Sequence, residues 1–386
     1  MPLPEHPTSV HTSMRTAFAA SARNWLVLAL VIGLFSLAPG FRSVFFTRDY
    51  LPQVFEQSAR NIVLAVGMSF VIFTGGIDLS VGSVLALSGV GLGLSLSAQM
   101  PGWMSFLAAL PFAIVAGWGV HVALLRRHAL RFSRLHSVII AVVAAAVLEL
   151  LAGIGLSRGI ASGVHVEAAI CLCLLIGTAC GFINGLTVSL GSVPPFVVTL
   201  GMMSAARGLT LFATDGSSVS TRDYPRLLAL GHGPQLIAIA ITVVAIGSVI
   251  VKQQRCGRYI FSIGGNENAS RLSGVDVVKF KTLAYVLSGI CAAIGAVMVT
   301  AMFGQASTNA ASGAELEAIA SVVIGGASLS GGHGSIMGAM VGALTITVIT
   351  AGLILVQVPD TLQQVVLGVV IVVTVLADQF RRHSHS

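Results

Sequence analysis

One short polar stretch carries the residues most able to do chemistry: Gly75–Ser83, which reads G-G-I-D-L-S-V-G-S. It lies between two apolar runs, residues 61–74 and 84–98. A charged side chain at the centre of a bilayer costs about 2.5–3.5 kcal/mol on insertion scales, so the presence of Asp78 there indicates a function or a specific partner. Two roles are open for it. Asp78 contacts a transported substrate, or Asp78 and Ser80 cap the helix that follows by accepting its backbone N–H groups.

A related stretch returns near the other end of the chain as Gly325–Ser335, G-G-A-S-L-S-G-G-H-G-S. The matched positions are Gly75 with Gly325, Gly76 with Gly326, Asp78 with Ser328, Ser80 with Ser330, and Gly82-Ser83 with Gly334-Ser335 after two extra residues. Paired glycine-broken hydrophobic segments in the two halves of a chain are typical of a translocation pathway. Irregular backbone is tolerated at membrane depth only where protein buries it or where it lines a watery cavity.

Other polar residues stand alone within apolar runs. Asn184 and Arg207 could each line the pathway or form hydrogen bonds between helices, and both alternatives stay open. Burial against another polar group is favoured over a proton relay for Glu149. His121 lies near the end of an apolar run, where an interfacial position is favoured over a ligand role.

The basic segment 252–281 contains a predicted short helix, Glu267–Leu272. Asn266 can cap its start and Gly274 can end it. We expect this helix to dock a partner, with Leu272 as an apolar knob, although a solvated basic loop is the alternative. The residues of this predicted coupling loop are Gly264, Gly265, Asn266, Glu267, Ala269, Arg271, Leu272 and Gly274.

Composition defines the class of protein. Of 386 residues, 55% are hydrophobic and 9% charged, whereas a soluble domain carries about 25% charged residues. We therefore predict an all-α polytopic membrane protein with about 10–12 transmembrane or half-spanning helices, broken at the two glycine-rich repeats. The predicted apolar segments are 25–39, 59–75, 81–98, 103–125, 137–156, 166–190, 196–213, 236–251, 282–302, 319–330, 334–356 and 362–378. Segment 319–330 is too short to cross and is predicted to be a half-helix or a re-entrant piece.

Lys and Arg concentrate in alternate connecting segments, which places both termini in the cytoplasm. Residues 1–24 lack the small-residue cleavage site of a secretory signal and are predicted to be a retained cytoplasmic tail. Residues 25–380 form a single membrane domain. The net charge of +7 follows this membrane asymmetry, so it does not indicate nucleic acid.

Several chemistries have no motif in the chain. It holds no G-x-x-x-x-G-K-[ST] phosphate loop, no H-E-x-x-H and no G-x-S-x-G. Its five cysteines show no zinc or disulfide spacing. We therefore expect no catalytic residue, metal or cofactor, and we expect the protein not to be an enzyme.

Glycines recur every four residues in two apolar runs, which puts them on one face of a helix where backbones can approach closely. Helix packing is favoured over a direct functional role for these six residues. They are Gly177, Gly181 and Gly185, and Gly334, Gly338 and Gly342.

Four blocks of sequence resemble the membrane-spanning permeases of bacterial ABC sugar importers, the ribose, xylose and arabinose group. The blocks are Ala65–Gly89, Asn184–Gly201, Gly257–Val275 and Glu315–Ser335. The resemblance implies a dimer of permease chains, homo- or heterodimeric, in the bacterial inner membrane. It also implies a periplasmic sugar-binding protein and a cytoplasmic ATPase that couples through the loop around 266–274. About 65 extra residues near 98–165 depart from the family pattern.

The resemblance and the residues together predict a permease subunit that moves a monosaccharide inward, driven by ATP hydrolysed on a partner chain. The alternative is an ion-coupled secondary transporter that uses Asp78 and Glu149, because paired broken helices fit that class too.

Overall fold

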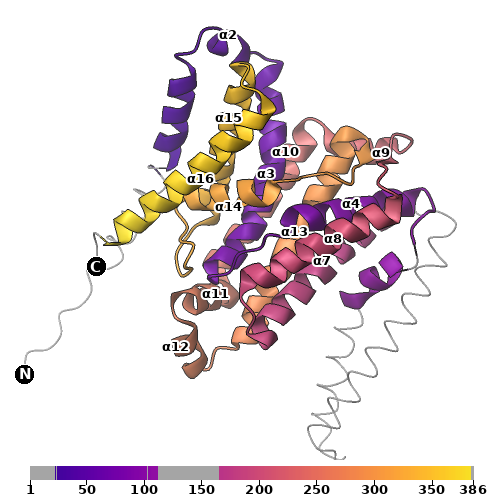
Figure 1. The fold of residues 1–386 in the computed structure, drawn as a ribbon, viewed down its shortest axis with the longest axis vertical. Coiled ribbons are helices and arrows are strands. Elements are labelled where there is room, and N and C mark those ends of the chain that lie inside the picture. Colours follow the sequence, from indigo (N-terminus) through magenta and orange to yellow (C-terminus); the bar gives the residue numbers. More distant parts are fainter. Residues whose placement is uncertain (1–21, 23, 102, 112–164, 384–386) are drawn as a thin grey trace, which may run out of the picture. The chain divides into compact units, whose positions relative to one another are not determined.

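The computed structural model describes residues 22, 24–101, 103–111 and 165–383 (Figure 1). Helices dominate this part of the chain, as the apolar runs predict. Five of the described helices are long and apolar enough to cross a membrane: α7 (Val166–Gly191), α8 (Pro195–Thr214), α10 (Pro234–Gln253), α13 (Val277–Phe303) and α15 (Ile336–Leu355). The protein is thus an all-α polytopic membrane protein.

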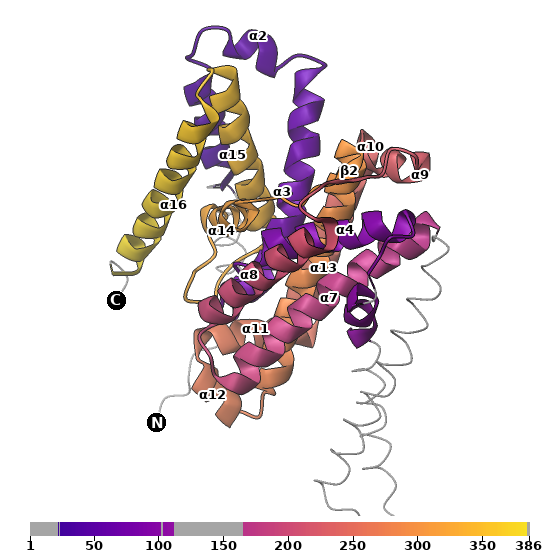
Figure 2. The same cartoon turned by 45° about the vertical axis from the view of Figure 1, so that its right-hand side comes forward.

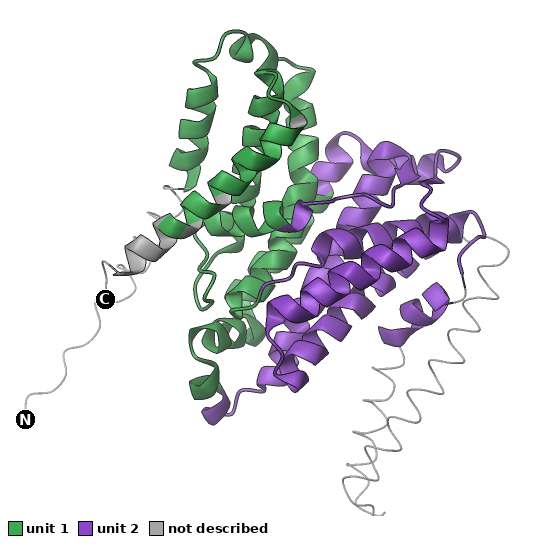
Figure 3. Ribbon diagram, in the orientation of Figure 1, with its two compact units in different colours: residues 1–76, 239–270, 316–386 green, residues 77–238, 271–315 purple. Residues whose placement is uncertain are grey.

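The chain forms two compact units (Figure 3). Unit 1 is built from both ends of the chain and one central piece, residues 1–76, 239–270 and 316–386. Unit 2 comprises residues 77–238 and 271–315. The first glycine-rich stretch is therefore divided, because the chain passes from unit 1 to unit 2 between Gly76 and Ile77.

Unit 1 is organised around the pair α3 (Tyr50–Phe73) and α15, which pack together (Figure 1). The short helix α2 (Phe41–Phe45) covers one end of α15 and buries two stacked phenylalanine rings, Phe41 and Phe45, whose centroids are 4.6 Å apart. Their apolar neighbours include Leu28, Val54 and Val348. The other helices of unit 1 are Asn24–Phe35, the main part of α10, α11 (Arg255–Gly265), α14 (Ala314–Ile324) and α16 (Asp360–His383).

Unit 2 is organised around α7 and α13, which run side by side in both views (Figures 1 and 2). Helix α4 (Val81–Leu96) packs on both, and α8 packs on α4. Two short strands, β1 (Val219–Ser220) and β2 (Gln305–Ala306), pair antiparallel. The connection after β1 forms α9 (Pro225–Leu228) and a 3-10 turn, η1 (Ala229–Gly231).

Glycines set the spacing of the α7–α13 pair. A Cβ atom on Gly177 or Gly181 would collide with the carbonyl oxygen of Gly289 or Tyr285 of α13. A Cβ on Gly185 would lie 2.6 Å from the Cα of Thr282. In unit 1, Gly338 and Gly342 of α15 meet the backbone of Gly325 and Ser321 in the same way. The packing role predicted for these five glycines is confirmed. The sixth, Gly334, was wrongly placed on the same helix face, because it precedes α15.

The predicted half-helix is α14, whose 11 residues rise about 16 Å, about half of the hydrocarbon core. The helix ends at Ile324 and not at residue 330, since glycines follow. Several other boundaries differ from prediction, since α3, α13 and α14 begin earlier than expected, at Tyr50, Val277 and Ala314. Asn24, placed in the tail, already belongs to the apolar helix Asn24–Phe35. Segment 137–156 and the far part of 103–125 lie outside the described residues, as do His121, Glu149 and most of the extra segment.

Candidate functional site

The first break begins where α3 ends. Gly75 adopts a left-handed conformation, φ +79°, and the next N–H, of Gly76, donates to the carbonyl of Val71 at 3.1 Å. This 6→1 bond with a left-handed residue before it is a Schellman ending, which glycine favours because it has no Cβ. The glycine pair therefore stops the helix abruptly at this point.

Asp78 lies just before α4 and is 2% exposed. Its Oδ1 accepts the backbone N–H of Ser80 at 3.0 Å and the Ser80 hydroxyl at 2.6 Å. Its Oδ2 accepts the hydroxyl of Ser288, from α13, at 2.8 Å. Ser80 is the N-cap residue of α4, and its side chain makes no capping bond. Asp78 therefore holds the residue that precedes the helix and does not bond to the first helical N–H groups.

Asn184 of α7 extends this network, since its amide donates to the Ser80 hydroxyl at 2.9 Å. Three elements of unit 2 thus meet at one cluster: the start of α4, α7 and α13. The cluster is closely packed and leaves no room for a water molecule, and the Asn184 Oδ1 is buried there with no hydrogen-bond partner among the described residues. No cationic side chain of the described residues contacts Asp78.

Asn184 and Arg207 both form hydrogen bonds between elements, while their predicted position along the pathway stays a prediction. Asn184 is 1% exposed and bonds between helices. Arg207 of α8 donates to the backbone carbonyl of Thr308, in the loop after α13. Both side chains connect elements of unit 2.

The second break has the same kind of ending, one position later. Gly326 is left-handed, φ +88°, and the N–H of Ala327 donates to the carbonyl of Val322 at 3.1 Å. The Ser328 hydroxyl accepts the N–H of Ser330 at 3.2 Å, which reproduces the Asp78–Ser80 turn. The match of Gly82-Ser83 with Gly334-Ser335 does not extend to structure. Gly82-Ser83 lies inside α4, whereas Gly334-Ser335 precedes α15.

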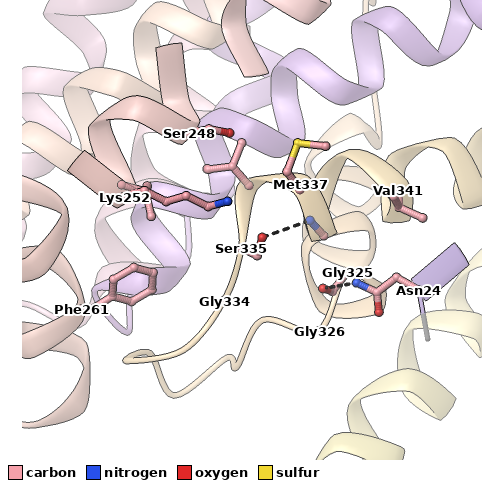
Figure 4. Close-up of a pocket in the computed structure, with 13 residues that line it drawn as sticks. Asn24, Ser248, Lys252, Phe261, Gly325, Gly326, Gly334, Ser335, Met337 and Val341 are labelled. Atoms are coloured by element: carbon pink, nitrogen blue, oxygen red, sulfur yellow. Dashed lines mark hydrogen bonds between the residues drawn. The ribbon is translucent and has the colours of Figure 1, made fainter. Parts of the chain in front are cut away.

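A cavity of about 500 Å³ adjoins the second break in unit 1 (Figure 4). Asn24 donates to the carbonyl of Gly325 at its edge, at 2.8 Å. Ser335 caps α15 by accepting the N–H of Gly338. The Lys252 side chain, at the end of α10, extends toward Ser335 in this view. The second break therefore faces an open, partly polar space, unlike the closed cluster around Asp78.

The coupling loop is folded as two helices. The predicted helix is present as α12 (Glu267–Leu272), and Asn266 Oδ1 accepts the N–H of Ala269 at 2.9 Å. Gly274 ends it in a left-handed conformation, φ +83°. Leu272 is 90% exposed, an unusual position for a leucine in an ordered helix. Helix α11, which precedes α12, was not predicted.

The structure divides the predicted site residues between the two units. Asp78, Ser80 and Asn184 meet in unit 2, while the glycines of the first break lie in unit 1 with the whole second break and the start of the coupling loop. Sequence reasoning missed Ser288 and the α11 residues that contact α3. The only signals were an isolated Ser-Gly pair at 288–289 and the apolar spacing of Gly257, Ile260 and Phe261.

Paired broken helices in a helical membrane protein are typical of transport proteins. The family model described as "Branched-chain amino acid transport system / permease component" matches residues 132–375, and the chain belongs to this family. The ribose import permease RbsC of Haemophilus influenzae is 33% identical, covering 94% of both chains. RbsC of Bacillus subtilis is 34% identical, covering 92% of this chain and 90% of that protein.

The D-allose transport system permease AlsC of Escherichia coli is 30% identical, covering 92% of this chain and 90% of that protein. No solved structure matches the chain. The chain is therefore a permease subunit of a sugar ABC importer, a multi-pass protein of the inner membrane, and is not itself an enzyme.

Proposed function

We propose that this chain, paired with a second permease chain, moves a monosaccharide into the cytoplasm, driven by an ABC ATPase docked on α12. A periplasmic binding protein delivers the sugar from the other side. The observation that carries this proposal is α12 itself. This short capped helix lies in the basic segment 252–281 and carries Leu272 at 90% exposure, which supports a docking role in which the leucine enters a groove on the partner.

The docking is tested with Leu272→Asp, which places a charge where the apolar contact forms. We expect the variant to reach the membrane folded, because Leu272 makes so little contact with the rest of the chain. ATPase co-purification and hydrolysis stimulated by the binding protein should fall together. Ala269→Trp, on the same exposed helix, should act in the same direction by steric block.

Leu272→Met is the matched control, since it keeps an apolar side chain of similar volume and should behave as wild type. If Leu272→Asp leaves both co-purification and stimulated hydrolysis intact, the segment is a solvated basic loop and the docking proposal is wrong.

The substrate is proposed to be a small aldose of the ribose, xylose or arabinose kind. The similarity to ribose and D-allose import permeases supports this substrate class. Uptake of labelled ribose by cells that express the whole system, with unlabelled ribose, xylose, arabinose and allose as competitors, identifies the preferred sugar. Competition by branched-chain amino acids in place of sugars would contradict the proposal.

We propose that the two breaks line the translocation pathway and that Asp78 acts by holding α4, α7 and α13 together. Its three accepted hydrogen bonds and 2% exposure support positioning over direct substrate contact. The residues assigned to the pathway are Gly75, Gly76, Asp78, Ser80, Asn184, Gly325, Gly326, Ser328 and Ser330.

An ion-coupled secondary transporter is the alternative, with Asp78 and Glu149 as ion sites; Glu149 lies outside the described residues. The three hydrogen bonds that Asp78 accepts from Ser80 and Ser288 disfavour this alternative, because a coupling carboxylate must exchange its ligands during the cycle. Sugar uptake by purified permease in vesicles, driven by a proton or sodium gradient without the ATPase, would decide for the alternative.

The proposed topology has both termini in the cytoplasm. In a background that lacks the native cysteines, Asn268→Cys should react with impermeant thiol reagents only from the cytoplasmic side. Ser217→Cys should react only from outside. Both side chains are exposed, whereas Ser270 of α12 is buried and would label poorly.

A further inference from the structure

Four glycines from three distant parts of the chain meet in unit 1. They are Gly75 at the end of α3, Gly264 near the end of α11, and Gly331 and Gly332 in the loop of the second break. We call this set the glycine junction. It brings the first break, the second break and the base of the coupling loop to one point.

Backbone approaches backbone throughout the junction. A Cβ atom on Gly331 would lie 2.6 Å from the nitrogen of Gly75 and 2.8 Å from the Cα of Gly264. A Cβ on Gly332 would lie 2.9 Å from the Cα of Gly265. Real Cβ atoms do not tolerate such distances from backbone, so the three segments can pack this closely only because these positions lack side chains.

A hydrogen bond and a ring contact fix the junction. The N–H of Gly332 donates to the carbonyl of Phe73 at 3.1 Å. That carbonyl belongs to the last turn of α3, which has no helical donor left for it. The Phe73 ring stacks on Phe261 of α11, with centroids 4.8 Å apart. The end of α3 therefore contacts both α11, through the Phe73 and Phe261 rings, and the second break, through the Gly332 hydrogen bond.

We infer that the glycine junction transmits movement of the coupling loop to both breaks, which makes Gly264 a positioning residue for transport. This inference rests on the proposed docking of the ATPase on α12. Only Asn266 separates α11 from α12. A displacement of α12 by the ATPase would therefore move the C-terminal end of α11, where Gly264 lies. Because the contacts are between main chains, displacement of α11 has no flexible side chain to absorb it.

Gly264→Ala is the direct test, and the neighbouring residue supplies a matched control. A Cβ on Gly264 would collide with the Phe73 carbonyl and lie 2.5 Å from the Gly332 nitrogen, whereas a Cβ on Gly265 meets nothing within 4 Å. Both glycines lie in α11 and neither is left-handed, so alanine raises helix propensity at both. The difference between the two variants isolates the junction contact.

We expect Gly264→Ala to co-purify with the ATPase as wild type does. Sugar transport and hydrolysis stimulated by the binding protein should fall about tenfold, in the range by which residues along a coupling route change it. Gly265→Ala should keep both. Equal activity of the two variants would overturn the inference.

A second measurement uses the wild-type complex and does not depend on how the variants fold. Amide hydrogen exchange is compared between the resting complex and the complex trapped with ATP and vanadate. Exchange should change together in peptides covering 71–76, 260–274 and 325–335. A change at 260–274 with none at 325–335 would overturn the inference. Failure of Leu272→Asp to uncouple, by contrast, would remove the docking proposal itself.

Discussion

The two glycine breaks share one backbone design and differ in what their polar residue does. Each ends a helix with a left-handed glycine, Gly75 or Gly326, and each then forms a turn in which a side-chain oxygen accepts the N–H two residues on. In the first break that side chain is Asp78, which also accepts hydrogen bonds from the hydroxyls of Ser80 and, on α13 of unit 2, Ser288. In the second it is Ser328, whose hydroxyl bonds only within its own turn among the described residues.

This difference separates two properties of a broken helix: the reversal of the chain and its attachment to neighbouring helices. Glycine supplies the chain reversal in both copies, so an abrupt helix end does not require a carboxylate. Asp78 adds a fixed connection between α4 and α13, while the second break stays beside an open cavity. The first break is therefore anchored by the side chain of Asp78, whereas the second break is held through the main-chain contacts of Gly331 and Gly332.

The largest expected effect is that of Asp78→Ala. It leaves the N–H and hydroxyl of Ser80 and the hydroxyl of Ser288 without their acceptor, and an unsatisfied buried polar group costs about 1–3 kcal/mol. We expect the free energy of unfolding of the purified protein to fall by about 3 kcal/mol or more. Ser88→Ala is the control, because the buried Ser88 hydroxyl of α4 has no hydrogen-bond partner in the part of the chain that the structure describes, so its removal should cost little.

If the two helix ends are equivalent, alanine substitution of Gly75 and of Gly326 should lower the free energy of unfolding by similar amounts. Alanine at Gly75 or at Gly326 must adopt a left-handed conformation, which costs about 1–2 kcal/mol. Gly313→Ala calibrates this cost, since Gly313 has φ +85° and open space around it. Unfolding measurements that gave a much larger loss for one of the two breaks would contradict their equivalence.

Ser328→Ala should have a smaller effect than Asp78→Ala. The turn loses one weak acceptor for the Ser330 N–H, and the expected decrease in the free energy of unfolding is about 1 kcal/mol. A loss as large as that of Asp78→Ala would show that the second break is held as firmly as the first.

The smallest effect is expected from Asp78→Asn. The amide oxygen can still accept from Ser80, and the Ser288 hydroxyl can turn to accept from the new NH₂ group. The variant should keep transport and change the free energy of unfolding by less than about 0.5 kcal/mol, since its main hydrogen bonds survive. Loss of transport at normal membrane levels would show that the negative charge itself is needed.

Local signals in the sequence were sufficient for much of the fold. The apolar runs located the long helices, and the pair Asn266 and Gly274 gave both ends of α12 correctly, because caps act over a few residues. The half-helix α14 was also evident from its length. Helix α11 was missed because Arg255 and Arg258, which lie on its exposed face, interrupt the apolar run along the chain, although Gly257, Ile260 and Ile263 form a buried face at helical spacing.

The register of the second break could not be read from the sequence. Both breaks contain a glycine pair, and either glycine of a pair can take the left-handed position. The first glycine does so in one copy and the second in the other. Ser288 was missed for another reason: it lies 210 residues from Asp78, and a serine in an apolar helix gives no sign of which distant group it meets.

The hydrogen bond from Asn24 to Gly325 has a consequence for the order of synthesis. The two residues are 301 positions apart, and Asn61 donates to Thr347 across 286 positions. The first helices therefore enter the membrane long before the ribosome has made their partners, whereas the segments of unit 2 are completed in the interval. During that time the amides of Asn24 and Asn61 lack the acceptors that they use in the folded protein, and unit 1 is complete only when residues 316–386 have been synthesised.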